Sequence, residues 1–126
     1  MLTHINNYLT KYIQDAGSLV AAASSLGIIG FPVYWIIWTY IYPQPYDNFI
    51  LRMIATALSL ILITYYFLPK RYYGIFAIYW LLTLAYIGPG IHTYLMLKND
   101  FNDISSVCYL ITLFVLFLFI SNILLL

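Results

Sequence analysis

The chain is built from long apolar runs separated by short polar breaks. The apolar runs cover about residues 18–42, 48–68, 72–97 and 103–126. Each run is close to the ~20 residues that a helix needs to cross the hydrocarbon core of a bilayer. Because short connections join antiparallel neighbours in helix bundles, the pattern predicts an all-α membrane protein with four antiparallel transmembrane helices.

The two ends of the chain differ in polarity. Residues 1–17 are polar and predict a short helix in which Tyr8, Tyr12 and Ile13 share a face, as an interfacial or cytoplasmic segment. The bundle domain then covers residues 18–126. The last residues lie inside an apolar run without a polar stop, which predicts that the chain is a piece of a longer membrane protein.

Composition supports a membrane protein and excludes several other classes. Hydrophobic residues make up 64% of the chain and charged residues 7%, whereas soluble domains carry about 25% charged residues. The net charge of +1 and the lack of a basic patch exclude nucleic acid as a partner. The single cysteine and two scattered histidines predict neither a metal site nor a bound cofactor.

The basic residues indicate the orientation of the chain. Lys70 and Arg71 flank a very short connection, where the excess of basic residues on the cytoplasmic side is most informative. With Lys11 they predict a cytoplasmic N-terminus, and they place Arg52 and Lys98 near the outer surface.

Helix-breaking residues occur inside two of the predicted spans. Pro32 follows two glycines in the first span, and Gly88, Pro89 and Gly90 are consecutive in the third. Proline removes a helical hydrogen bond and clashes with the preceding turn. We therefore expect kinks at both places, which either hold a gap open between helices or serve packing alone.

Small and polar residues recur at helical spacing on one face of each span. In membrane bundles such faces contact other helices, which explains most of these residues as packing groups. Several of them nevertheless fall within about two turns of the same membrane surface, which is the outer one if the N-terminus is cytoplasmic. They predict an outer-half pocket for a small amphiphile, with these candidate ligand-binding residues: Trp35, Trp38, Arg52, Thr56, Gly90, Thr93, Ser105, Cys108 and Thr112.

Each of the more distinctive side chains also has a plain structural interpretation. Arg52 fits a position near the lipid headgroups, paired with Asp47 or with phosphate. Trp35 and Trp38 fit the aromatic belt of a membrane helix. His92 lies on a different face from Thr93 and fits an interfacial histidine, and Cys108 fits a small core residue.

The stretch around the first proline resembles a known family. The residues that carry the resemblance are Gly30-Phe31-Pro32-x-Tyr34-x-x-Ile37-Trp38-x-Tyr40 and Pro43-Gln44-x-Tyr46-x-Asn48-x-x-Leu51-Arg52. They are similar to the N-terminal membrane domain of the CqsS/LqsS-type sensor histidine kinases, which are bacterial receptors for α-hydroxyketone quorum-sensing signals. Pro69-Lys70 and Asn99-Asp100 also match in place.

The resemblance implies that this chain is the first four helices of a six-helix sensor domain in the bacterial inner membrane. It implies a small amphiphilic signal molecule as the ligand and a homodimer formed through a kinase module that this chain lacks. The chain itself is therefore not expected to be an enzyme. The resemblance also places Ser105 and Cys108 at ligand contacts, although the family pattern has a tryptophan and a serine there.

Two other functions are compatible with a small bundle. A proton-coupled transporter needs a carboxylate within the membrane, but the sequence has no glutamate and its aspartates fall at predicted helix ends or turns. A non-catalytic membrane subunit is the second alternative. A membrane enzyme is disfavoured because no nucleophile, base and orienting group can be assembled from this sequence.

Overall fold

The computed structural model describes residues 2–124, and the side chains of residues 4–119. Within those residues the chain is entirely helical and has no β-strand. The elements in order are α1 (Leu2–Asp15), α2 (Gly17–Ile36), η1 (Ile37–Ile41), α3 (Phe49–Leu62), η2 (Ile63–Phe67), η3 (Lys70–Tyr72), α4 (Tyr73–Ala85), η4 (Tyr86–Gly90), α5 (Ile91–Lys98) and α6 (Asp103–Leu124). The predicted all-α class is confirmed.

Three of these helical stretches are long and apolar enough to cross a membrane. They are Gly17–Ile41, Phe49–Phe67 and Lys70–Lys98, with 25, 19 and 29 residues. At ~1.5 Å per residue, even the shortest is about 28 Å long and nearly matches the ~30 Å hydrocarbon core. The fourth predicted span corresponds to helix α6. Its apolar stretch Asp103–Phe119 is shorter than the three stretches above. A fourth crossing therefore stays a prediction.

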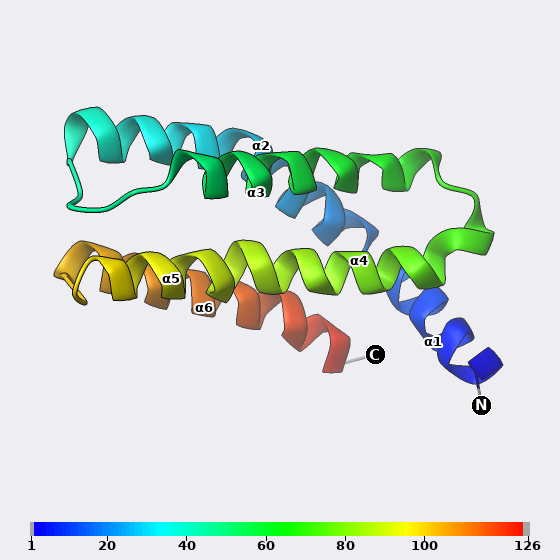
Figure 1. Cartoon of the computed structure of the whole chain (residues 1–126). Coiled ribbons are helices and arrows are strands. Elements are labelled where there is room, and N and C mark those ends of the chain that lie inside the picture. The colour runs from blue at the N-terminus through cyan, green and yellow to red at the C-terminus, as the bar shows by residue number, and fades with distance from the viewer. Residues whose placement is uncertain (1, 125–126) are drawn as a thin grey trace.

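The long helices lie in two antiparallel pairs (Figure 1). Helix α2 pairs with α3, and the continuous rod formed by α4, η4 and α5 pairs with α6. Small residues bring α2 and α3 close together: Ser24 Oγ donates to the Ser59 carbonyl at 2.8 Å, and a Cβ at Gly27 would overlap the Ser59 side chain. Such close approach is typical of packed membrane helices.

Helix α1 packs against α4. Tyr12 and Ile13 are buried, and the Trp80 indole Nε1–H donates to the Tyr12 hydroxyl at 2.8 Å. Burial raises the pKa of Tyr12, which keeps this hydroxyl neutral. Tyr12 and Ile13 are the buried part of the predicted face, while Tyr8, one turn earlier on the same helix, is 58% exposed.

The two prolines have different effects on the backbone. Pro89 lies in η4, a π-helical turn between α4 and α5, so the expected irregularity in the third span is present. Pro32 lies inside α2, which continues as an α-helix to Ile36 before the π-helical turn η1.

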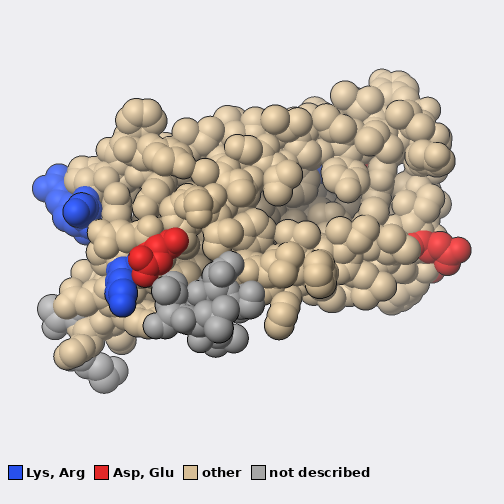
Figure 2. All heavy atoms as spheres, turned by 180° about the vertical axis from the view of Figure 1, so that it is seen from behind, with Lys and Arg blue, Asp and Glu red and all other residues tan. Residues whose placement is uncertain are grey.

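Two clusters of buried apolar residues divide the molecule along its length. The proximal end, where α1 and the connection at residues 68–69 lie, contains Tyr12, Ile13, Val20, Leu62, Phe76 and Trp80. The distal end, where residues 42–48 and 99–102 connect helices, contains Phe31, Trp38, Ala55, Ile91 and Leu95. Figure 2 shows charged atoms gathered at the two ends of one face, with an almost uncharged surface between them.

Candidate functional site

A cavity of about 270 Å³ lies between α2, the α4–η4–α5 rod and α6. Its walls are the α2 residues from Ala23 to Tyr34, the rod residues from Leu84 to His92 and the α6 residues from Cys108 to Phe119. Some of these side chains belong to the proximal cluster and others to the distal cluster. The volume is close to the lower end of the ~300–1,000 Å³ range of small-molecule pockets.

The cavity changes in polarity along its length. Its polar side chains are Tyr34, His92, Cys108 and Thr112, which lie on the distal parts of their helices. The proximal part is lined by apolar residues, which include Ala23, Leu26, Leu84, Val115, Leu116 and Phe119. The cavity is therefore amphipathic: polar groups occur toward the distal end and apolar walls toward the proximal end. It is partly open to the surface, where Leu26 and Ile111 are exposed.

A buried ion pair lies at the distal end beside this cavity. Arg52 is 1% exposed, and its Nε donates to both carboxylate oxygens of Asp47 at 2.8 and 3.1 Å. The guanidinium also lies 4.8 Å from the centre of the Trp38 ring, a cation–π contact. The predicted pairing with Asp47 is confirmed, but the arginine is covered by protein.

Within the part of the chain that the structure describes, one guanidinium nitrogen of Arg52, Nη2, is buried and has no hydrogen-bond partner. A buried donor without a partner is unfavourable by about 1–3 kcal/mol, and more when it is charged. The charge of Arg52 also acts on His92 and Cys108, both of which line the cavity.

The distal connections hold Asp47 in place. Asn99 is buried, and its Nδ2 donates to the Tyr46 and Leu95 carbonyls at 2.9 and 2.8 Å, while its Oδ1 accepts from the Tyr46 amide at 2.8 Å. Asn48 caps α3 by accepting from the Leu51 amide at 3.2 Å. Hydrogen bonds from the Tyr94 hydroxyl and from Asn48 lower the pKa of the half-buried Tyr46 phenol.

Replacing Asn99 with leucine should therefore loosen the 42–48 connection. The substitution removes three hydrogen bonds and leaves the Tyr46 amide without its partner, so we expect a loss of about 1–3 kcal/mol in the free energy of unfolding. Faster hydrogen exchange at Tyr46 and Asn48 would check this. The exposed Asp100 is the matched control: Asp100→Asn keeps a residue type that tolerates the positive φ there and should leave that exchange unchanged.

The nine predicted ligand-binding residues fall into distinct groups in the structure. Cys108 and Thr112 line the cavity. Trp38 and Arg52 contact each other beside it, and Thr56 Oγ1 donates to the Arg52 carbonyl at 3.0 Å. Of these five, only Cys108 and Thr112 lie in the cavity wall, because η1 and α3, which carry the other three, contribute no lining residue.

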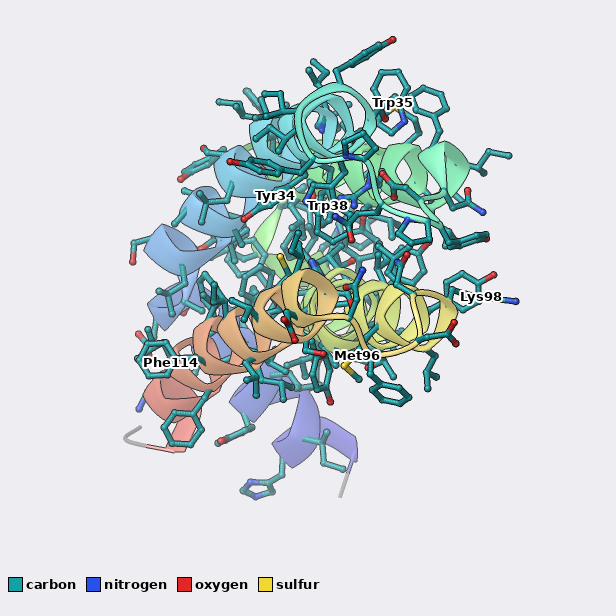
Figure 3. All side chains as sticks on the ribbon, turned by 90° about the vertical axis from the view of Figure 1, so that its left-hand side faces the viewer. Tyr34, Trp35, Trp38, Met96, Lys98 and Phe114 are labelled. Atoms are coloured by element: carbon teal, nitrogen blue, oxygen red, sulfur yellow. The ribbon has the colours of Figure 1, made fainter. Side chains whose placement is uncertain are left out.

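The other four predicted residues lie away from the cavity walls. Trp35 packs at the outer edge of α2 against the Phe49 ring at 4.9 Å, while Trp38 points between the helix pairs (Figure 3). Gly90 is exposed and Thr93 is half-buried. Ser105 is buried at the start of α6, where its Oγ donates to the Asn102 carbonyl at 3.0 Å.

His92 lines the cavity, although the sequence interpretation placed it at the interface. Ordinary helical spacing accounts for its position, because Leu84, Gly88 and His92 line the cavity four residues apart. Gly90 and Thr93 lie on another side of the rod. The four-residue spacing from Leu84 is the sequence signal that could have identified His92.

Comparisons with known proteins give one informative similarity. No family model matches the chain, and no solved structure matches it. The chain is 32% identical over 114 residues to the CAI-1 autoinducer sensor kinase/phosphatase CqsS of Vibrio cholerae serotype O1. The match covers 90% of this chain but only 17% of that relative. The predicted resemblance of this chain to the membrane sensor domain of CqsS-type kinases is thereby confirmed.

Proposed function

We propose that this chain is the membrane-embedded input domain of a quorum-sensing histidine kinase and that it binds a small amphiphilic autoinducer such as an α-hydroxyketone. The observation that carries this proposal is the change from polar to apolar lining along the cavity. A ligand with a polar head and an alkyl tail fits such a cavity, with its head against the polar lining and its tail against the apolar lining. The similarity to an autoinducer sensor kinase supports the same assignment.

The polar head of the ligand lies at the distal end in this proposal. There it meets Cys108 and Thr112 and is close to the Arg52–Trp38 contact. The alkyl tail extends toward Phe119. The remaining predicted residues, Trp35, Thr56, Gly90, Thr93 and Ser105, belong to the same proposed outer-half site and act by shaping or closing its distal end.

Signalling requires that the ligand prefers one arrangement of the helices over another. A ligand shifts a conformational equilibrium only through unequal affinity for the two states. The π-turn η4 borders the cavity through Ile87 and Gly88, the π-turn η1 follows the last cavity-lining turn of α2, and π-turns are frequent at functional sites. We propose that ligand binding changes the packing of the rod against α2 and α6 at these turns.

The proposed orientation has the proximal end at the cytoplasm of a bacterial inner membrane. The basic residues Lys11, Lys70 and Arg71 support this orientation, because α1 and η3 bring them to the proximal end. Helix α6 then forms the fourth span. Further helices, a kinase module and a homodimer formed through that module complete the proposed receptor.

Filling the cavity tests the proposal. No heavy atom lies within 4 Å of a Cβ built on Gly30, which borders the cavity, so Gly30→Leu adds volume there without a backbone clash. We expect this variant to bind a long-chain α-hydroxyketone at least about tenfold more weakly, since overpacking typically costs about 1–3 kcal/mol. Binding is measured by tryptophan fluorescence with the protein in nanodiscs.

The matched control is Ala22→Leu, which adds the same side chain to the exposed face of the same helix. It should bind the ketone like the unsubstituted chain. Equal binding by all three proteins, or no saturable binding by any, would rule out this cavity as the ligand site.

A further inference from the structure

His92 differs from the other residues that line the cavity. It carries the only imidazole there, and its Nδ1 lies 3.0 Å from the carbonyl oxygen of Gly88 in the π-turn. The Ile87 carbonyl also lies close to the ring. Both carbonyls lie on the preceding turn of the same rod, so the backbone itself fixes the imidazole.

The hydrogen bond to Gly88 determines which ring nitrogen carries the proton. A carbonyl oxygen can only accept, so Nδ1 must be the donor. In a neutral imidazole the other nitrogen then carries a lone pair and accepts. His92 therefore offers Nε2 as a hydrogen-bond acceptor to a molecule that enters the cavity.

The other polar side chains of the cavity are weaker partners for a ligand hydroxyl. The Thr112 hydroxyl donates to the Cys108 carbonyl at 2.8 Å and can still accept, but an alcohol oxygen is a weaker acceptor than an imidazole nitrogen. The phenol oxygen of Tyr34 is likewise a weaker acceptor, and that side chain is 44% exposed, while the thiol of Cys108 is only a weak hydrogen-bonding group. Neighbouring walls are apolar and offer no alternative. A ligand that cannot donate would leave the imidazole lone pair buried without a partner, which is unfavourable.

We propose that Nε2 of His92 accepts a hydrogen bond from a hydroxyl group on the ligand and so selects hydroxylated over plain ketone amphiphiles. This inference rests on the proposed ligand function of the cavity and adds the residue that recognises the hydroxyl. In this arrangement His92 is a specificity-determining residue, and the π-turn that holds it is part of the site.

The test compares three ligands with the same alkyl chain: an α-hydroxyketone, its O-methyl ether and the ketone without the hydroxyl. The unsubstituted chain in nanodiscs should bind the hydroxyketone about tenfold more tightly than either of the others, as expected for one buried hydrogen bond. In His92→Leu the three affinities should agree to within about twofold. His92→Gln keeps an acceptor near the Nε2 position and should restore a preference for the hydroxyketone.

The ratio of affinities separates recognition from a structural effect. If His92 only supports the fold, His92→Leu weakens all three ligands equally and the preference remains, which would overturn the inference. Loss of the preference in Thr112→Val but not in His92→Leu would also overturn it. His4→Leu, on the exposed part of α1, is the histidine control and should change nothing.

The outcome also distinguishes this inference from the proposed function. Tight binding of all three ligands, abolished by Gly30→Leu, would keep the cavity as the ligand site and remove the role of His92. Absence of binding to the unsubstituted chain would remove both.

Discussion

Replacing Asp47 with alanine should lower the free energy of unfolding by about 3–5 kcal/mol, because it leaves the buried guanidinium of Arg52 without its counterion. Arg52 is 1% exposed, so water cannot replace the carboxylate without opening the distal end. Its Nη2 already lacks a hydrogen-bond partner within the described part of the chain. Removing the carboxylate would leave Nε without its partner as well. Thermal unfolding in detergent, followed by circular dichroism, measures the effect.

Removing both charges separates the ion pair from simple loss of contacts. In Asp47→Ala/Arg52→Met no charge remains buried, and most of the lost stability should return because a well-packed apolar replacement is often neutral. Asp100→Asn, which removes an exposed carboxylate at the same end and keeps a residue type that tolerates the positive φ of this position, is the matched control and should change stability by less than about 0.5 kcal/mol. An Asp47→Ala variant as stable as that control would contradict the prediction.

The helices themselves could be predicted from hydropathy because a membrane leaves the backbone few choices. Within lipid every N–H and C=O must be bonded inside the segment, so an apolar run of sufficient length becomes a helix. The predicted ranges 18–42, 48–68 and 72–97 accordingly agree to within a few residues with the three helical stretches that are long and apolar enough to cross a membrane, Gly17–Ile41, Phe49–Phe67 and Lys70–Lys98.

The cavity-lining face was predicted on α6 but not on the α4–η4–α5 rod. The spacing along α6 placed Cys108 and Thr112 among the candidate ligand-binding residues, and both border the cavity. On the rod, Leu84, Gly88 and His92 line the cavity at the same regular spacing, whereas Gly90 and Thr93 lie on another side. The face of this span was selected by its small and hydroxyl-bearing residues, which is why His92 was passed over.

The environment of Arg52 could not be predicted from local sequence. Its pairing with Asp47 follows from their separation along the chain, but its burial depends on the 42–48 connection folding back over the helix ends. That connection is held by Asn99, which is distant in sequence and had no predicted role. Long-range hydrogen bonds of this kind leave no periodic pattern in the sequence.

The packing of α1 also depends on contacts between residues that are distant in sequence. Its amphipathic pattern predicts a helix with one apolar face but does not specify the surface that this face covers. In the structure the partner is α4, and the contact is fixed by a hydrogen bond between residues far apart in sequence, Tyr12 and Trp80. Helix α1 is therefore a packed part of the proximal core.

Replacing Trp80 with alanine should be the most disruptive single change at the proximal end, with a loss of about 3–5 kcal/mol in the free energy of unfolding. The side chain is fully buried and its ring contacts that of Phe119 edge-on at 6.0 Å. The alanine variant leaves a large void and also removes the donor to Tyr12. Protease cleavage within α1 should become faster, because this helix loses its main anchor on α4.

Two phenylalanine variants divide that loss into its parts. Trp80→Phe keeps most of the ring volume but removes the indole N–H, and Tyr12→Phe removes the hydroxyl that accepts from it, so each should cost about 1–3 kcal/mol. The double variant should cost less than the sum of the two, because both changes delete the same hydrogen bond. Trp35→Ala, at the outer edge of α2, is the tryptophan control and should destabilise far less. Strict additivity of the two phenylalanine variants would contradict a role of the Tyr12–Trp80 hydrogen bond in holding α1. The loss of stability in Trp80→Ala would then come from packing alone.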